Sequence, residues 1–98
     1  MIDIGLSTIS IEKDIARRAK QRRMEQHLTQ SELAQKADIP VSTYRLFEQR
    51  GSVSLSSLVK VAFALGCIDD FNSLFANQRW ANIDDMLKSA DKQRVRHD

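Results

Sequence analysis

Apolar residues recur at helical spacing along most of the chain, which predicts a succession of amphipathic helices. The whole sequence contains one Pro and three Gly, and almost every break falls where a helix is expected to end. Residues 1–9 alternate only weakly and are expected to form a frayed or strand-like extension. Ser10 is a candidate cap for a first helix to about Gln26. Four of its residues are expected to face inward: Ile11, Ile15, Ala19 and Met24.

The clearest helix start lies at Thr29. Thr29 and Glu32 are spaced as a capping box, in which each side chain accepts a hydrogen bond from the other residue's amide. Leu28 and Leu33 stand at the positions of a hydrophobic staple, which fixes how the chain enters the helix. These signals predict a short second helix that ends near Ala37.

Four more helical segments are predicted, at residues 41–49, 55–65, 70–75 and 82–90. Pro40 suits the first turn of the third helix because it has no amide hydrogen to donate, and Gly51 and Gly66 suit helix ends. Ser54 and Asn82 are candidate caps. In the fourth and fifth helices, the residues expected to be buried are Leu55, Leu58, Val59, Ala62, Leu65, Phe71, Leu74 and Phe75.

The predicted fold class is therefore all-α, with five helices and a short C-terminal helical extension. Ninety-eight residues accommodate one hydrophobic core. We expect an N-terminal extension at 1–9, one helical domain at 10–76 and a partner-binding segment with a basic tail at 77–98. The sequence has neither a run of eighteen apolar residues nor the basic start of a signal peptide, and its lone Cys67 fits a reducing compartment. A cytoplasmic protein is expected.

Charge is distributed unevenly along the chain. Residues 12–27 carry six basic residues against three acidic ones, whereas residues 69–87 carry one against four. This asymmetry is typical of a protein with one surface for a polyanion and another for a different partner. It fits ordinary solvated helix faces equally well, so charge alone does not decide between the two interpretations.

Two short helices joined by a tight turn are the geometry of a helix-turn-helix, whose second helix enters the major groove of DNA. Ala34 is small enough for a close approach, Ile39 fills the angle of the turn, and Tyr44 and Phe47 form an apolar inner face. The outward positions left over are Val41, Ser42, Arg45, Leu46 and Gln49. Ser and Arg side chains read base edges, and apolar side chains contact the thymine methyl. An ordinary helical hairpin is the alternative interpretation.

Residues 15–75 resemble the lambda-repressor-like, XRE-family helix-turn-helix domain, a five-helix fold that binds DNA. The resemblance is carried by Leu-Thr-Gln-Ser-Glu-Leu-Ala at 28–34, Ser-Thr-Tyr-Arg-Leu-Phe-Glu at 42–48 and Leu-Val-Lys-Val-Ala-Phe-Ala-Leu-Gly at 58–66. It implies base contacts from Val41, Ser42, Thr43, Arg45 and Leu46. It implies a phosphate contact from Gln30 and further backbone contacts from Gln49, Arg50 and Ser54.

The same resemblance implies a structural ion pair between Arg23 and Glu48, which ties the recognition helix to its scaffold. The chain departs from the family pattern at two places. The loop Glu-Gln-Arg-Gly at 48–51 is one residue longer than the common Glu-x-Gly, and Pro40 replaces the usual capping Ser. The longer loop bears on the phosphate contacts expected after the third helix. Pro40 bears on where the third helix begins.

A narrower resemblance covers nearly the whole chain. The loop at 47–51, residues 54–58, the Phe75 region and residues 83–87 with the basic tail are similar to HipB-like proteins. Those proteins are the DNA-binding partners of HipA-type Ser/Thr kinase toxins. The resemblance implies a bacterial, nucleoid-associated repressor of its own operon that binds a kinase toxin, alone or with a third small protein. In three-component versions a separate chain does most of the neutralising.

We expect a homodimer on a palindromic DNA operator, with half-sites about one helical turn apart. Its interface is predicted from apolar residues that so small a core cannot hide: Phe71, Leu74, Trp80, Ile83, Met86 and Leu87. Trp80 as a cap on the domain's own core is the alternative. Two other functions stay open, a stand-alone or phage-type repressor without a toxin and a helical module that binds only proteins.

An enzyme is not expected, because the sequence has no Gly-rich phosphate loop, no paired His and no Ser or Cys beside a suitable base. No cofactor and no metal are expected either, since His27 and His97 lie far apart in the sequence. Cys67 is expected to be a small buried hydrophobe, and His27 a surface residue. The basic residues of the tail, Lys92, Arg94 and Arg96, are candidates for nonspecific DNA affinity.

Overall fold

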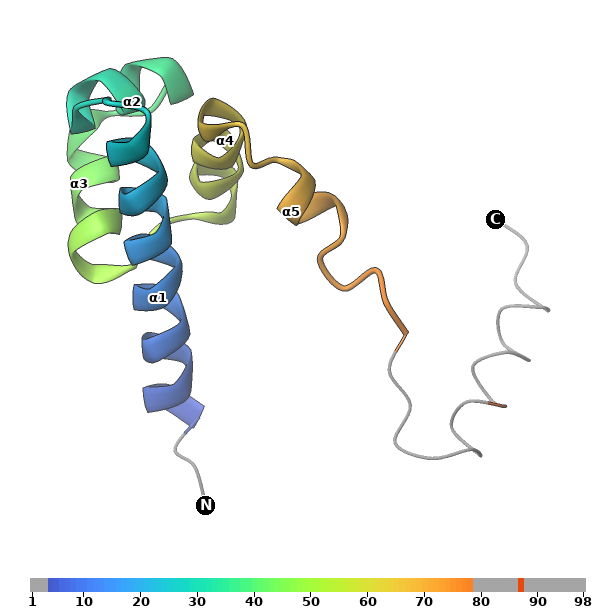
Figure 1. Cartoon of the computed structure of the whole chain (residues 1–98). Helices are drawn as coiled ribbons and strands as arrows, with labels where there is room; N and C mark the ends of the chain where they lie inside the picture. Colours follow the sequence, from blue (N-terminus) through green and yellow to red (C-terminus); the bar gives the residue numbers. More distant parts are fainter. Residues whose placement is uncertain (1–3, 79–86, 88–98) are drawn as a thin grey trace.

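The computed structural model describes residues 4–78 and residue 87, and these residues form five helices and no strand (Figure 1). The helices are α1 (Ile4–Glu25), α2 (Gln30–Ala37), α3 (Val41–Arg50), α4 (Leu55–Leu65) and α5 (Asp69–Asn72). The all-α fold with five helices is therefore confirmed. The last predicted segment, at 82–90, lies outside the described residues apart from Leu87.

The first helix is longer than the sequence pattern predicts. It begins at Ile4 rather than after Ser10, so residues 4–9 are helical and the expectation of a frayed or strand-like stretch there is wrong. No Pro interrupts this stretch, and a helix that has already formed extends at low cost per residue. As a result the N-terminal half of α1 projects past the end of α3 (Figure 1).

The side of α1 that faces the core also differs from the prediction. Ile11 and Met24 were expected to face inward but are 57% and 56% exposed. Ile15 and Ala19 pack beside the core as predicted, and the fully buried residue of this helix is Ala16. The small side chain of Ala16 allows α3 to approach α1 closely.

Hydrogen-bonded caps begin and end the helices around the α2–α3 unit. The Thr29 hydroxyl accepts from the Glu32 amide at 3.0 Å, and the Thr29 amide donates to the Glu32 carboxylate at 2.9 Å, so the predicted capping box is confirmed. The Ser54 hydroxyl accepts from the Ser57 amide at 3.1 Å and caps α4. Asp38 ends α2 in the left-handed conformation, at φ 57°, which Asp tolerates better than most residues.

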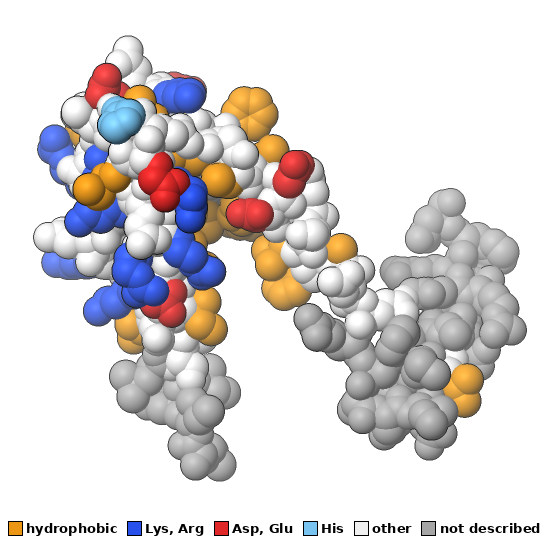
Figure 2. All heavy atoms as spheres, viewed as in Figure 1, with side chains coloured by type: hydrophobic (Ala, Val, Ile, Leu, Met, Phe, Trp, Pro, Cys, Tyr) orange, Lys and Arg blue, Asp and Glu red, His pale blue; other side chains and the backbone are white. Residues whose placement is uncertain are grey.

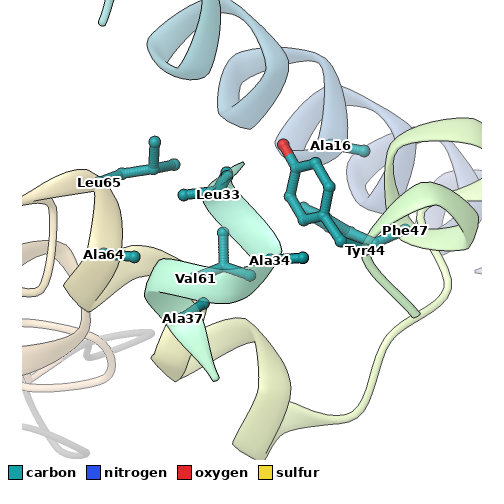
Figure 3. Close-up of a cluster of buried hydrophobic side chains, with 9 residues drawn as sticks. All are labelled: Ala16, Leu33, Ala34, Ala37, Tyr44, Phe47, Val61, Ala64 and Leu65. Atoms are coloured by element: carbon teal, nitrogen blue, oxygen red, sulfur yellow. The ribbon is translucent and has the colours of Figure 1, made fainter. Parts of the chain in front are cut away.

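The core lies where the first four helices meet (Figure 3). Its largest fully buried side chains are Tyr44, Phe47, Leu33 and Val61. The rings of Tyr44 and Phe47 meet edge to face, with their centroids 6.0 Å apart. Burying a side chain such as Leu33 stabilises the fold by roughly 1.5–3 kcal/mol. The inner face predicted for α3 is therefore at the centre of the core.

The buried faces of α4 and α5 differ from those predicted. Of the residues predicted to be buried, Ala62 and Leu65 are buried, Leu58 and Val59 are half-buried and Leu55 is 67% exposed. Val61 and Ala64 are buried as well. Apolar residues lie all round α4, so their spacing does not single out one face. Helix α5 ends at Asn72 rather than at Phe75 as predicted. Leu74 and Phe75 follow it and are 53% and 95% exposed, because this part of the chain leads away from the other helices (Figure 1).

Gly51 marks the place where the end of α3 touches α1. It has φ +76°, and a Cβ built there would lie 2.8 Å from the carbonyl carbon of Glu12, closer than real Cβ contacts allow. Gly66 has the same φ, but nothing lies within 4 Å of its Cβ position. Both positions favour glycine for conformational reasons, and only Gly51 also needs the absence of a side chain.

Substituting each glycine by Ala separates these two effects. A left-handed conformation costs an L-residue roughly 1–2 kcal/mol. Gly66→Ala is expected to lower the free energy of unfolding by about that cost, and Gly51→Ala by more, because the backbones of α1 and α3 must also move apart. Urea unfolding followed by circular dichroism measures both changes. Equal losses would contradict the close contact between Gly51 and Glu12.

Candidate nucleic-acid interface

A tight turn at residues 38–40 joins α2 to α3. The Asp38 amide donates to the Gln35 carbonyl at 3.1 Å, and the Ile39 amide donates to the Ala34 carbonyl at 3.0 Å. Ala34 is 1% exposed and Ile39 packs against the core, so small and apolar side chains occupy the inside of the angle. Pro40 precedes α3 and makes no side-chain cap. The two helices therefore have the helix-turn-helix arrangement.

The third helix has a buried inner face and a polar outer face. Tyr44 and Phe47 are 0% and 1% exposed. The exposed residues of α3 are Ser42, Arg45, Leu46, Gln49 and Arg50. Val41 and Thr43 are half-buried, and Val41 packs against the core. The outer face thus offers cations, hydrogen-bonding groups and one apolar side chain, the groups that proteins use to read base edges.

One carboxylate, that of Glu48, joins α3 to the two helices before it. Arg23 of α1 donates to both of its oxygens, from Nε at 2.7 Å and from Nη2 at 3.1 Å. Gln30 of α2 donates from Nε2 to Glu48 Oε1 at 3.1 Å. The hydroxyl of Tyr44, one turn earlier on α3, donates to Glu48 Oε2. We call these four residues the Glu48 network.

The Glu48 network is largely shielded from solvent. The side chains of Arg23 and Glu48 are 11% and 5% exposed, and Nη1 of Arg23 donates to the Leu28 carbonyl at 2.8 Å. No buried side-chain nitrogen or oxygen within the described residues lacks a hydrogen-bond partner. Removing one partner of a buried ion pair costs about 3–5 kcal/mol, because the other charge is left uncompensated. The network therefore holds α3 in one position on α1 and α2.

The network also fixes the protonation states of its members. Burial raises the pKa of the Glu48 carboxyl, but hydrogen bonds from Arg23, Tyr44 and Gln30 outweigh burial, so its pKa lies below the ordinary 4.5. Burial, and then the hydrogen bond to Glu48, raise the pKa of the Tyr44 phenol well above its ordinary 10.0. At neutral pH, Glu48 is therefore a carboxylate and Tyr44 a neutral donor.

Basic side chains gather on the body formed by α1, α2 and α3, whereas acidic and hydrophobic groups mark α5 in the same view (Figure 2). Two arginines of α1 are held by acidic residues of their own helix, Arg17 by Asp14 and Arg22 by Glu25. Arg45 and Arg50 are exposed, and neither forms an ion pair with another described residue. Their charges are available to a polyanion.

The sequence profile of the helix-turn-helix family matches residues 20–68, which is half of the chain and covers α2, α3 and α4 completely. The chain belongs to the helix-turn-helix family. Its domain is of the XRE-like type, and the family comprises DNA-binding regulatory domains rather than enzymes. No curated protein and no solved structure matches the chain.

The described part of this helix-turn-helix protein offers no metal site. Within residues 4–78 and 87, no three His, Cys, Asp or Glu side chains group in a way that could hold a metal ion. His27 is exposed, and Cys67 is half-buried. None of the described helices is both long and apolar enough to cross a membrane.

The predicted DNA-contacting residues lie on α2, on α3 and in the loop that follows. Gln30 opens α2 and is half-buried, with its amide turned to Glu48. The predicted base-contacting residues occupy the first two turns of α3, and Gln49 and Arg50 its exposed end. The Ser54 hydroxyl accepts in the α4 cap, which leaves its own hydrogen for a further acceptor.

The residues predicted for a dimer or partner interface are only partly described. Phe71 is half-buried, and Leu74 and Leu87 are 53% and 56% exposed. Trp80, Ile83 and Met86 lie outside the described residues. The described members thus leave apolar surface uncovered on the single chain.

Sequence reasoning missed two members of the Glu48 network. Tyr44 was expected only as an apolar core residue, although it stands four positions before Glu48, where helix side chains are neighbours. Gln30 was expected to contact phosphate, and nothing in the sequence places it beside Glu48. A further bond, from Gln26 Nε2 to the Leu65 carbonyl at 2.8 Å, joins the residue after α1 to the end of α4.

Glu48→Gln tests the buried ion pair. It is expected to lower the free energy of unfolding at neutral pH by about 3–5 kcal/mol, because Arg23 loses its countercharge. The folded-state pKa of Glu48 is depressed, so its contribution is complete above the unfolded value near 4.5 and is lost as pH falls through the folded value. The stability gap between wild type and Glu48→Gln should therefore narrow in acid.

Glu25→Gln is the matched control, because the Arg22–Glu25 pair has the same 2.7 Å separation but side chains that are 51% and 59% exposed. An exposed pair contributes about 0–1 kcal/mol. Urea unfolding between pH 3 and pH 7 measures the free energy of unfolding of wild type and both variants. This range spans the pH of about 4 at which ordinary carboxyl groups titrate. A Glu48→Gln loss no larger than the control's, or a gap independent of pH, would contradict the role given to Glu48.

Proposed function

We propose that the chain is a sequence-specific transcriptional repressor that inserts α3 into the major groove of DNA. The observation that carries the proposal is the exposed outer face of α3, held on its scaffold by Glu48 in a helix-turn-helix regulator. In this motif the first helix crosses the DNA backbone and the second lies in the groove. The proposed base-contacting residues are Val41, Ser42, Thr43, Arg45 and Leu46.

Arg45 is the proposed main determinant of sequence specificity. It is exposed and unpaired among the described residues, and Arg binds the O6 and N7 atoms of guanine through two hydrogen bonds. Leu46 is 41% exposed, which suits contact with a thymine methyl. Ser42 supplies a hydroxyl that accepts or donates.

A second set of side chains positions the protein on the phosphates: Gln30, Gln49, Arg50 and Ser54. Phosphate contacts set register and orientation without carrying sequence information. Gln30 has two amide hydrogens, of which one is bound to Glu48 and the other is left for a phosphate oxygen. Glu48 thereby orients Gln30 as well as α3.

The repressor is proposed to act as a homodimer on a palindromic operator. A helix-turn-helix dimer places its two recognition helices about one turn of DNA apart, which requires a symmetric interface between copies. The apolar residues that the single chain leaves uncovered after α4 support such an interface, Leu74 and Leu87 among them. The proposed interface residues are Phe71, Leu74, Trp80, Ile83, Met86 and Leu87.

The biological partner is proposed to be a HipA-type Ser/Thr kinase toxin, with this chain as the autoregulatory HipB-like component of the operon. The loop at 47–51 and the acidic segment with a basic tail at 83–98 support this assignment through their similarity to HipB-like proteins. The proposal covers complexes of these two proteins and complexes that also contain a third small protein. The alternative is a stand-alone or phage-like repressor with the same DNA-binding half and no toxin.

Fluorescence anisotropy on the duplex upstream of the reading frame tests DNA binding. Wild type is expected to bind this duplex more tightly than a scrambled one, with affinity that falls as salt rises. Arg45→Ala should cost about 1–3 kcal/mol and abolish much of the preference between the duplexes. Arg50→Ala should weaken both duplexes alike and reduce the salt slope by about 1.

Lys60→Ala is the control for these variants. It removes the same charge from the exposed face of α4, outside the proposed interface, and should reproduce wild-type selectivity. Flat titrations on both duplexes, or selectivity unchanged in Arg45→Ala, would reject the assignment of α3 as the reading helix.

Affinity purification of the tagged chain from its native host, followed by mass spectrometry, tests the proposed partner. A Ser/Thr kinase encoded beside this chain is expected to co-purify in a stable ratio and to remain bound in Arg45→Ala, because base reading is not needed for the partner. Recovery of the chain with DNA but no kinase would favour the stand-alone repressor.

A further inference from the structure

A groove opens where α1, the end of α3 and the start of α4 meet. It has a volume of about 190 Å³; its floor is apolar, made by Ile15, Phe47, Val53 and Leu58, and Glu12 and Ser52 lie at its polar positions. An engineered cavity of about 150 Å³ admits benzene. The groove therefore has room for one large apolar side chain.

The apolar surface continues from the groove onto the projecting end of α1. Ile11 lies one helical turn before Ile15, on the same side of the helix, and is 57% exposed. Residues 4–11 contain no charged side chain, so this end of α1 is not suited to the phosphate backbone. An exposed apolar surface beside a groove is typical of a protein interface.

A complementary apolar face stands near the other end of the sequence. Trp80, Ile83 and Leu87 recur at the spacing that places them on one side of a helix. Leu87 is 56% exposed, and α5 and residues 73–78 lead away from the first four helices (Figure 1). The docking segment begins shortly after these residues in the sequence, and short segments of this kind are exchanged between copies in domain-swapped dimers.

We propose that the groove is the docking site for residues 80–87 of a second copy of this chain, and that the exchange is reciprocal. The inference rests on the proposed homodimer and identifies how its two copies hold each other. Trp80 enters the groove, and Ile83 and Leu87 cover Ile11 and the exposed side of α1.

Charged residues stand beside both surfaces. Glu12 lies at the groove and forms no ion pair with another described residue. Arg79 and Lys88 stand directly before and after the docking segment, and Asp84 and Asp85 lie within it. With Trp80 in the groove, its neighbour Arg79 is the cation proposed to lie beside Glu12, while the apolar contacts supply most of the affinity.

The groove also adjoins the residues proposed to hold DNA. Ser52 and Val53 belong to the loop between α3 and α4, and Arg50 and Ser54, two of the proposed phosphate contacts, flank them in the sequence. A docked segment restricts the conformations of this loop. Each copy therefore completes the phosphate-binding loop of the other.

Trp80 is the only tryptophan in the chain, so its fluorescence reports on docking directly. In wild type, Trp80 should resist quenching by acrylamide at concentrations where sedimentation shows a dimer, and become quenchable on dilution to monomer. Ile11→Asp, Val53→Asp and Leu87→Asp should each leave Trp80 quenchable and the chain monomeric. Ile11 and Leu87 are exposed, so these two changes leave the fold intact, which circular dichroism verifies.

Ile9→Asp is the matched control for Ile11→Asp. Both isoleucines are exposed on the projecting end of α1, but they lie two residues apart and so point in nearly opposite directions. Ile9→Asp should retain the wild-type dimer and the protected Trp80. Equal damage from Ile9→Asp would reject the groove as the site.

Mixing two defective variants distinguishes exchange from docking within one chain. The Ile11→Asp chain keeps an intact docking segment, and the Leu87→Asp chain keeps an intact groove. An equimolar mixture should therefore recover mixed dimers in which one of the two tryptophans is protected. No recovery on mixing, or wild-type protection that is independent of dilution, would reject exchange between copies.

The DNA titration separates this inference from the proposed function. Wild type that dimerises and binds its operator while Trp80 stays fully quenchable would overturn the docking site and leave the repressor intact. Wild type that protects Trp80 in the dimer but binds no duplex would support the docking site and overturn the repressor.

Discussion

The carboxylate of Glu48 is the constraint on which the position of the recognition helix depends. It lies almost out of contact with solvent and accepts hydrogen bonds from Arg23 on α1, Gln30 on α2 and Tyr44 on α3. A buried charge is tolerated only when its lone pairs accept hydrogen bonds. Any shift of one helix against the others would break one of these bonds and leave part of the buried charge uncompensated. The three helices therefore move as one body.

This rigidity is what allows the outer face of α3 to read DNA in the proposed function. Residues that read base edges have to be held in register with those that contact the phosphates, and the Glu48 network joins the two sets through Gln30. Gly51 continues the same constraint to the end of α3, where a side chain would collide with the backbone of Glu12. The groove proposed to bind a second copy of the chain lies beside this contact and is lined by Glu12 and Gly51 among others. The end of α3 therefore takes part in the fold, in DNA reading and in the proposed dimer.

Local signals in the sequence predicted the helix-turn-helix well and the rest less well. The capping box at Thr29 and the apolar pair Tyr44 and Phe47 act over one or two turns, so spacing alone reveals them. The exposure of Leu55 depends on contacts between elements distant in the sequence, which periodicity does not contain. The early start of α1 has a local cause, the extension of a helix that no Pro interrupts, which the weak periodicity of residues 4–9 does not reveal. The four-way meeting at Glu48 is likewise tertiary, and only its ion pair was expected, through resemblance.

Chemical-shift mapping of the ¹⁵N-labelled chain titrated with its upstream duplex tests whether α3 reads DNA from a rigid scaffold, because it reports every amide at once. We expect the largest changes at Gln30, along residues 41–46 and in the loop at 49–54, with the exposed face of α4 around Phe63 unaffected. The amides at the Glu48 network should keep one sharp set of signals, as expected for a scaffold that does not rearrange. Changes centred on α4 or α5, with α3 silent, would contradict the account.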